Sequence, residues 1–170
     1  MLRQITRCHT PAVSTTIVVA TDGSDLAIDA ARQGLARLGP VDTILVVCAV
    51  EALDPSLAYD GSGHAGPSMT EDELERLQVQ AGVEGRAALD RTVVALDLDP
   101  VRGQIETRVV EGYAGPALCQ VAEEVSAEAL VVGTRGRGGL KRAVLGSVSD
   151  HIVRNARCPV VVVNPSASSV

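Results

Sequence analysis

The sequence predicts an α/β domain built around a parallel β-sheet, and three observations support this prediction. Five short runs of aliphatic and β-branched residues recur along the 170 residues. Segments with the apolar spacing of α-helices separate these runs, and such alternation is typical of a parallel sheet with helices on both faces. Several runs, such as Val160–Val163, are continuously apolar, which fits strands that are buried on both faces.

The expected strands carry the aliphatic core. The chain has no Phe or Trp and only two Tyr, so Val, Leu, Ile and Ala have to fill the interior. Hydrophobic residues make up 46% of the sequence, which excludes a mostly disordered chain. The five predicted strands are Thr16–Ala20, Thr43–Val50, Ile105–Val110, Ala129–Gly133 and Pro159–Val163.

Four helices are expected between these strands. They span Ser24–Leu38, Thr70 to about Leu96, Pro116–Ser126, and a last segment from near Ser147 to before Pro159. Proline is well suited to a first helical turn, which supports the start of the third helix. Two glycines, Gly82 and Gly85, interrupt the second helix, and each should cost up to ~1 kcal/mol relative to Ala.

The chain organises as one domain. We expect it to span residues 15–164, with an N-terminal extension at 1–14 and a tail at 165–170. The segment Asp54–Ser68 is rich in Gly and Pro and is expected to form a loop. No stretch approaches the ~20 apolar residues of a membrane helix, and residues 1–14 lack the apolar core of a signal peptide. We therefore expect a cytoplasmic protein that does not bind membranes.

The charge and the cysteines exclude other classes. A formal net charge of −6 argues against general binding to nucleic acids, whose phosphates attract basic surfaces. No CxxC pair occurs, and in a domain of this size we expect buried free thiols. The three histidines are isolated from one another in the sequence, so no metal site is expected. The cysteines are Cys8, Cys48, Cys119 and Cys158, and the histidines are His9, His64 and His151.

The segment that follows the fourth strand is rich in glycine and basic residues. Five glycines fall between Gly133 and Ser147, and glycine lets backbone N–H groups approach an anion closely. The helix expected from Ser147 adds the free N–H groups of its first turn. Four bases, Arg135, Arg137, Lys141 and Arg142, lie here without an acidic residue among them. This pattern favours a site for a small anion such as phosphate.

A structural interpretation of the same segment stays open. Glycine-rich turns and basic loops are common on protein surfaces. Ser147 and Asp150 also have the spacing of a capping box, in which both residues only stabilise a helix N-terminus. The segment contains neither the P-loop pattern GxxxxGK[ST] nor the dinucleotide pattern GxGxxG.

The spacing of these glycines resembles that of a known family. Gly133-x2-Gly136-x9-Gly146-Ser147 matches the G-x2-G-x9-G-[ST] pattern of ATP-binding universal stress proteins. The run Ala20-Thr21-Asp22-Gly23-Ser24 resembles the first strand and turn of that family, and Cys158-Pro159 resembles its last connection. The resemblance covers about Thr16 to Val163. It implies a Rossmann-like, five-stranded parallel sheet of order 3-2-1-4-5, with ATP, accompanied by Mg²⁺, over its C-terminal edge.

The resemblance also implies the residues of the site. Ala20 and Thr21 would line the adenine side, and the backbone of Ala49 would address adenine. Asp22 would contact the ribose or the metal and phosphates, cap the first helix, or do both. Val132, Gly133, Arg135 and Gly136 would follow the ribose and phosphates. Gly146, Ser147, Val148 and Ser149 would hold the terminal phosphates with N–H and hydroxyl donors.

The function implied is regulatory rather than catalytic. Members of the family usually dimerise through their last strand, and an apolar edge strand at Pro159–Val163 needs a partner. We therefore expect an ATP-binding homodimer in which nucleotide occupancy alters loop order or the binding of a partner. No nucleophile signature is present. Two alternatives stay open, a slow ATP hydrolase and a nucleotide-free dimeric adaptor.

Overall fold

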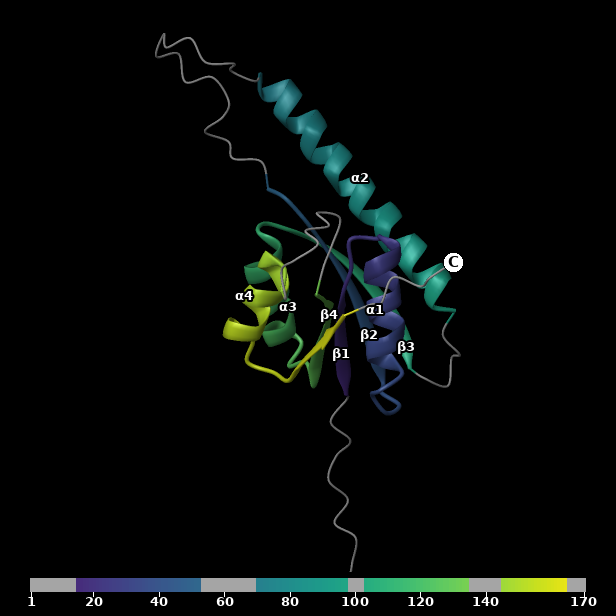
Figure 1. Cartoon of the computed structure of the whole chain (residues 1–170). Coiled ribbons are helices and arrows are strands. Elements are labelled where there is room, and N and C mark those ends of the chain that lie inside the picture. The colour runs from purple at the N-terminus through teal and green to yellow at the C-terminus, as the bar shows by residue number, and fades with distance from the viewer. Residues whose placement is uncertain (1–14, 53–69, 98–102, 135–144, 165–170) are drawn as a thin grey trace, which may run out of the picture.

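The strands form one parallel sheet. In the computed structural model, which describes residues 15–52, 70–97, 103–134 and 145–164, five strands pair in the order β3-β2-β1-β4-β5 (Figure 1). All four pairings are parallel. This arrangement confirms the predicted fold class and strand order. The strands are β1 (Thr16–Ala20), β2 (Thr43–Val50), β3 (Gln104–Glu111), β4 (Ala129–Gly133) and β5 (Val160–Val163).

Two helices cover each face of the sheet (Figure 1). Along β1, Ile17 and Val19 belong to the core under α1 and α2, while Val18 and Ala20 belong to the core under α3 and α4. Because successive side chains point to opposite faces, a strand covered on both sides has to be apolar throughout. The helices are α1 (Asp25–Leu35), α2 (Glu71–Leu96), α3 (Ala114–Glu124) and α4 (Ser147–Asn155).

Two helix boundaries differ from the prediction. The first helix ends at Leu35 rather than Leu38, because the amides of Arg37 and Leu38 turn back to the carbonyls three residues before them. The third helix starts at Ala114, so Pro116 lies within its first turn, as expected. Among the described helices, none is both long and apolar enough to cross a membrane.

The glycine at position 85 has a packing role in α2. A Cβ added to Gly85 would lie 2.8 Å from Cγ1 of Val50 and 3.2 Å from Cγ1 of Val109. The missing side chain therefore lets α2 lie directly on β2 and β3. The close packing offsets the low helix propensity of glycine, and α2 runs unbroken through Gly82 and Gly85.

The edges of the sheet are less covered than its centre. Val160, Val161 and Val162 of β5 are only half-buried, and β3 on the opposite edge is largely exposed. Burial on both faces, which the continuous run at Val160–Val163 predicted, is therefore wrong for most of β5. An edge strand is covered by fewer neighbours than a central one, so part of the apolar surface of β5 stays accessible.

The thiols are free but not all buried. Cys48 is buried in the core, as predicted, whereas Cys119 and Cys158 are only half-buried. Both lie at the margin of the core under α3 and α4, where the covering is incomplete. Burial still raises the pKa of both thiols above the ordinary value for cysteine. Cys8 lies outside the described residues.

Candidate functional site

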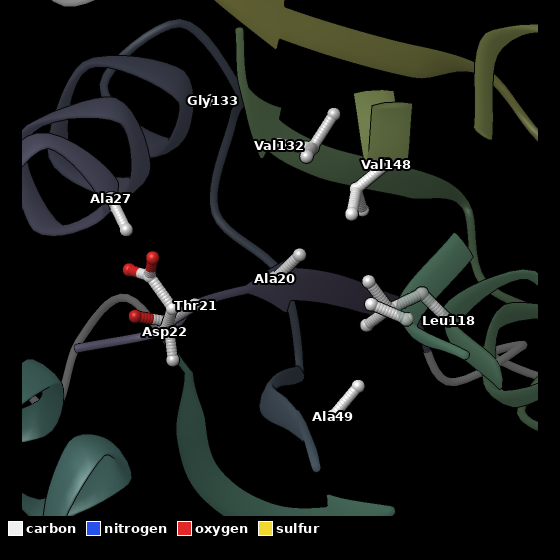
Figure 2. Close-up of a pocket in the computed structure, with 10 residues that line it drawn as sticks. Ala20, Thr21, Asp22, Ala27, Ala49, Leu118, Val132, Gly133 and Val148 are labelled. Atoms are coloured by element: carbon white, nitrogen blue, oxygen red, sulfur yellow. The ribbon is translucent and has the colours of Figure 1, made fainter. Parts of the chain in front are cut away.

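A largely apolar cavity opens at the carboxyl end of the sheet. The strands β1, β2 and β4 all end at this edge, where ligands of open α/β sheets usually bind. Figure 2 shows side chains from β1, α3 and α4 around the same space. The cavity is lined by Ala20, Thr21, Asp22, Ala27, Ala49, Ala114, Leu118, Val132, Gly133 and Val148. Most of the predicted site residues that the structure describes are among them.

The turn after β1 is held by hydrogen bonds. Oδ1 of Asp22 accepts from both the amide and the hydroxyl of Ser24, at 2.9 and 2.6 Å. The hydroxyl oxygen of Ser24 in turn accepts from the amide of Ala27, which makes Ser24 the N-cap of α1. The N-cap residue is therefore Ser24, and Asp22 supports the cap through it. Asp22 orients the capping residue while its own side chain lines the cavity.

The two ends of the glycine-rich segment lie next to each other. The amide of Thr134 donates to the carbonyl of Val163 and so extends the pairing of β4 with β5. The amide of Gly146 donates to the carbonyl of Thr134 at 2.8 Å. Thr134 and Gly146, described residues on either side of 135–144, therefore meet at one point of the sheet edge, beside the cavity. The predicted site residues Arg135 and Gly136 lie outside the described residues.

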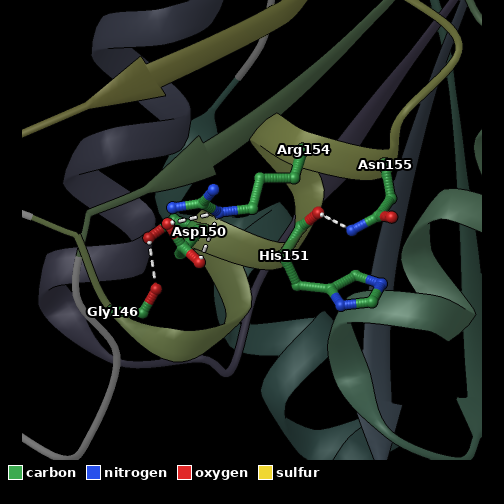
Figure 3. Close-up of polar contacts among 6 residues, drawn as sticks. Gly146, Asp150, His151, Arg154 and Asn155 are labelled. Atoms are coloured by element: carbon green, nitrogen blue, oxygen red, sulfur yellow. Dashed lines mark hydrogen bonds and ion pairs between the residues drawn. The ribbon is translucent and has the colours of Figure 1, made fainter.

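The N-terminus of α4 has no side-chain cap. Its N-cap residue is Gly146, and among the described residues no side chain accepts a hydrogen bond from the first-turn amides. The carboxylate of Asp150 is bonded instead to Nε of Arg154, at 2.9 and 3.1 Å (Figure 3). The capping-box interpretation of Ser147 and Asp150 is thus wrong. The first-turn amides have no acceptor within the helix, and this end of the helix carries a partial positive charge.

The serines of α4 differ in their accessibility. Ser147 is exposed, whereas Ser149 is buried and its hydroxyl donates to the carbonyl of Gly146 at 3.0 Å. The hydroxyl of Ser149 thus bonds to the backbone at the point where the glycine-rich segment joins α4. The groups of this segment best arranged to meet an anion are the amides of residues 147–149 and the hydroxyl of Ser147.

A close contact between α3 and α4 sets one wall of the cavity. A Cβ added to Gly115 would lie 2.7 Å from Cγ of His151, so the imidazole packs directly on the backbone of α3. Figure 3 shows the ring of His151 directed toward that helix. His151 has a half-buried position between the two helices. This contact holds α3, which carries Leu118, close to α4, which carries Val148.

Sequence reasoning missed three lining residues, Ala27, Ala114 and Leu118. Ala27 and Leu118 belong to the apolar stripes that predicted α1 and α3, so they were assigned to the core. Both residues lie at the end of their apolar stripe that is nearest the C-terminal edge of the sheet. This position could have indicated that they line the cavity. Among the described residues, no group of His, Cys, Asp and Glu could hold a metal ion by itself.

The chain belongs to the universal stress protein family. The model of that family matches residues 14–164, which is almost the whole chain. Over 147 residues the chain is 30% identical to universal stress protein MJ0531 of Methanocaldococcus jannaschii, and the match covers 86% of this chain and 80% of that protein.

Solved structures agree with this assignment. Universal stress protein UspA from Lactobacillus plantarum superposes with a TM-score of 0.67 at 18% identity, covering 89% of this chain and 98% of that one. A universal stress protein in complex with cAMP superposes with a TM-score of 0.53 at 28% identity, covering 89% of this chain and 98% of that one. The first likeness concerns the fold alone.

Proposed function

We propose that this protein is a universal stress protein that binds ATP, with Mg²⁺, and acts as a nucleotide-dependent regulator. The observation that carries the proposal is the combination of an apolar cavity with the uncapped amide end of α4 beside it. Such a pairing suits a ligand with an apolar plane at one end and an anion at the other. A nucleotide has this composition, and a relative at 28% identity was solved with cAMP.

The cavity suggests how the nucleotide lies. Ala20, Ala49 and Leu118 offer apolar surface for the base. Asp22 also lines the cavity, and a carboxylate there accepts hydrogen bonds from ribose hydroxyls but repels phosphate. The phosphates then extend toward the first turn of α4, and Arg135 and Gly136 join them from the glycine-rich segment. Mg²⁺ would be held mainly by the phosphates, as is usual for this ion.

A calorimetric titration with ATP tests the proposal. We expect one ATP per chain, weaker binding of AMP, and the weakest binding of adenosine, because each lost phosphate removes contacts at α4. Cyclic AMP belongs in the same series. A titration without heat, together with a melting temperature that ATP does not change, would contradict nucleotide binding and favour the adaptor alternative.

The regulatory role is distinguished from slow hydrolysis by a turnover assay with Mg²⁺ and ATP. We expect no sustained turnover, since the sequence has no nucleophile signature and Oδ1 of Asp22 is already bonded to Ser24. Sustained phosphate release that is lost in Asp22→Ala would contradict the regulatory assignment and favour an ATP hydrolase.

Three further expectations belong to the same proposal. We propose a homodimer through Pro159–Val163, supported by the half-buried valines of β5. The division into residues 1–14, 15–164 and 165–170 stays a prediction, which limited proteolysis would test. The cytoplasmic location also stays a prediction, which cell fractionation would test.

A further inference from the structure

A buried hydroxyl on α2 lies behind the turn that carries Asp22. The side chain of Thr92 is completely buried, and that of Thr21 is 8% exposed. Their Oγ1 atoms are 2.8 Å apart, although the two residues are 71 positions apart in the sequence. Burying a hydroxyl costs free energy unless the group is hydrogen-bonded. Each hydroxyl of this pair must therefore have a defined donor or acceptor.

The donors and acceptors of this pair have only one consistent order. The Thr92 hydroxyl donates to the carbonyl of Ala88 at 2.8 Å, which uses its only proton. Thr21 must therefore donate to Thr92, and the Thr21 oxygen in turn accepts from the amide of Gly23 at 3.0 Å. The bonds run in one chain from the Gly23 amide through both hydroxyls to the backbone of α2.

The backbone of the turn also packs directly on α2. Gly23 has φ of +72°, and a Cβ added there would lie 2.7 Å from Cα of Ala88. The amide of Thr21 meanwhile donates to the carbonyl of Val47 and extends the pairing of β1 with β2. The turn is thus held between the sheet on one side and α2 on the other, and Asp22 projects from it into the cavity.

We infer that Thr92 is a positioning residue of the nucleotide site. Thr92 does not itself line the cavity, and through its hydrogen bond with Thr21 it holds the turn that presents Asp22. This inference rests on the proposed function, because Asp22 matters only where a nucleotide binds. Without the Thr92 hydroxyl, the Thr21 hydroxyl loses its buried acceptor and rotates, and the Gly23 amide loses its partner.

Two pairs of variants isolate the hydroxyl. Thr92→Val keeps the branched shape of the wild-type side chain, and Thr92→Ala differs from Thr92→Ser only by the oxygen. We expect the affinity for ATP to fall about tenfold in Thr92→Val and in Thr92→Ala, roughly the effect of one lost buried hydrogen bond. The affinity of Thr92→Ser for ATP should stay within about twofold of the wild type, because serine keeps the hydroxyl group.

Two further measurements separate positioning from general stability. Leu96→Ala removes buried volume four residues beyond Thr92 in α2 and leaves the segment Thr21–Gly23 unaltered. It should therefore lower the melting temperature and leave the affinity for ATP unchanged. Hydrogen exchange of the Gly23 amide should accelerate in Thr92→Val and not in Leu96→Ala.

The results of these measurements distinguish the proposed function from the inference about Thr92. A wild-type protein that binds no nucleotide refutes the proposed function and the inference with it. A wild type that binds ATP while Thr92→Val binds equally well overturns the inference alone. Equal loss of affinity in Leu96→Ala would also overturn it, since general destabilisation would then suffice.

Discussion

Ser147 offers a test of whether phosphates bind at the N-terminus of α4. It is exposed and is the first residue of α4. A carboxylate at this position interacts favourably with the helix dipole, by about 0.3–1 kcal/mol. The same carboxylate would repel phosphate groups bound at the helix end.

We therefore expect Ser147→Asp to keep or raise the stability of the free protein and to weaken ATP binding about tenfold or more, as one nearby like charge would. Ser147→Asn is the matched control, because it has nearly the same shape without the charge. It should bind ATP much more tightly than Ser147→Asp, and adenosine should bind the two variants alike. Equal ATP affinity in both variants, measured by calorimetry, would show that the phosphates do not bind at this end of α4.

Gly34 tests the packing of α1 on the sheet. A Cβ added to Gly34 would overlap Cγ1 of Val131 in β4, whereas one added to Gly39 would meet nothing within 4 Å. Gly34→Ala should thus lower the free energy of unfolding by roughly 1–3 kcal/mol despite the better helix propensity of alanine. Gly39→Ala is the control, with a change within about 0.5 kcal/mol. Urea denaturation measures both, and an unchanged Gly34→Ala variant would mean that α1 packs differently.

At this scale the sequence predicted the cavity-lining residues that match the family's motifs better than those that lie in α1 and α3. Asp22 and Val148 could be assigned to the site from motif spacing. Leu118 could not, because its apolar side chain fits the core stripe of α3 equally well. Thr92 was hidden for a related reason: a single threonine in a helix does not indicate which distant hydroxyl it will meet.

Among the elements, α4 joins the glycine-rich segment to the rest of the fold. Its N-terminus has no side-chain cap, and Asp150, which could have capped it, pairs with Arg154 one turn later. The hydrogen bond with Arg154, and then the charge of Arg154, hold the pKa of the Asp150 carboxyl below its usual range.

The depressed pKa of Asp150 has a consequence for stability. Since the folded-state pKa is lower than the unfolded one, the pair stabilises the protein at neutral pH and loses this effect as pH falls through the folded-state value. Replacing Arg154 by Met should raise the Asp150 pKa toward the ordinary value of an aspartate side chain. A carboxyl-detected NMR titration measures this change, and an Asp150 pKa that does not move would show that the pair is not formed in solution.

The elements themselves were well predicted, and the errors have physical causes. The limits of β1, β2 and β4 followed from continuous apolar runs, because strands covered on both faces leave no polar positions. The run of β5 gave the same signal at an edge, where coverage is partial. The capping interpretation of Ser147 failed because sequence spacing could not reveal that Asp150 prefers Arg154 as its partner.

For the whole molecule, the exposed part of β5 predicts self-association. Val160, Val161 and Val162 are half-buried at the sheet edge, and an apolar edge strand without a partner promotes pairing between chains. We expect light scattering after size-exclusion chromatography to give twice the mass of the chain at micromolar concentration. A mass of one chain under these conditions would contradict the proposed dimer without affecting the nucleotide site.

The central claim is that the base of a nucleotide occupies the apolar cavity while its phosphates meet the first turn of α4. Amide NMR spectra recorded during titrations with ATP and with adenosine test it most directly. We predict that signals of Ala49 and Leu118 shift with both ligands, whereas those of Ser147, Val148 and Ser149 shift only with ATP. Unchanged signals from residues 147–149 at saturating ATP would contradict the account.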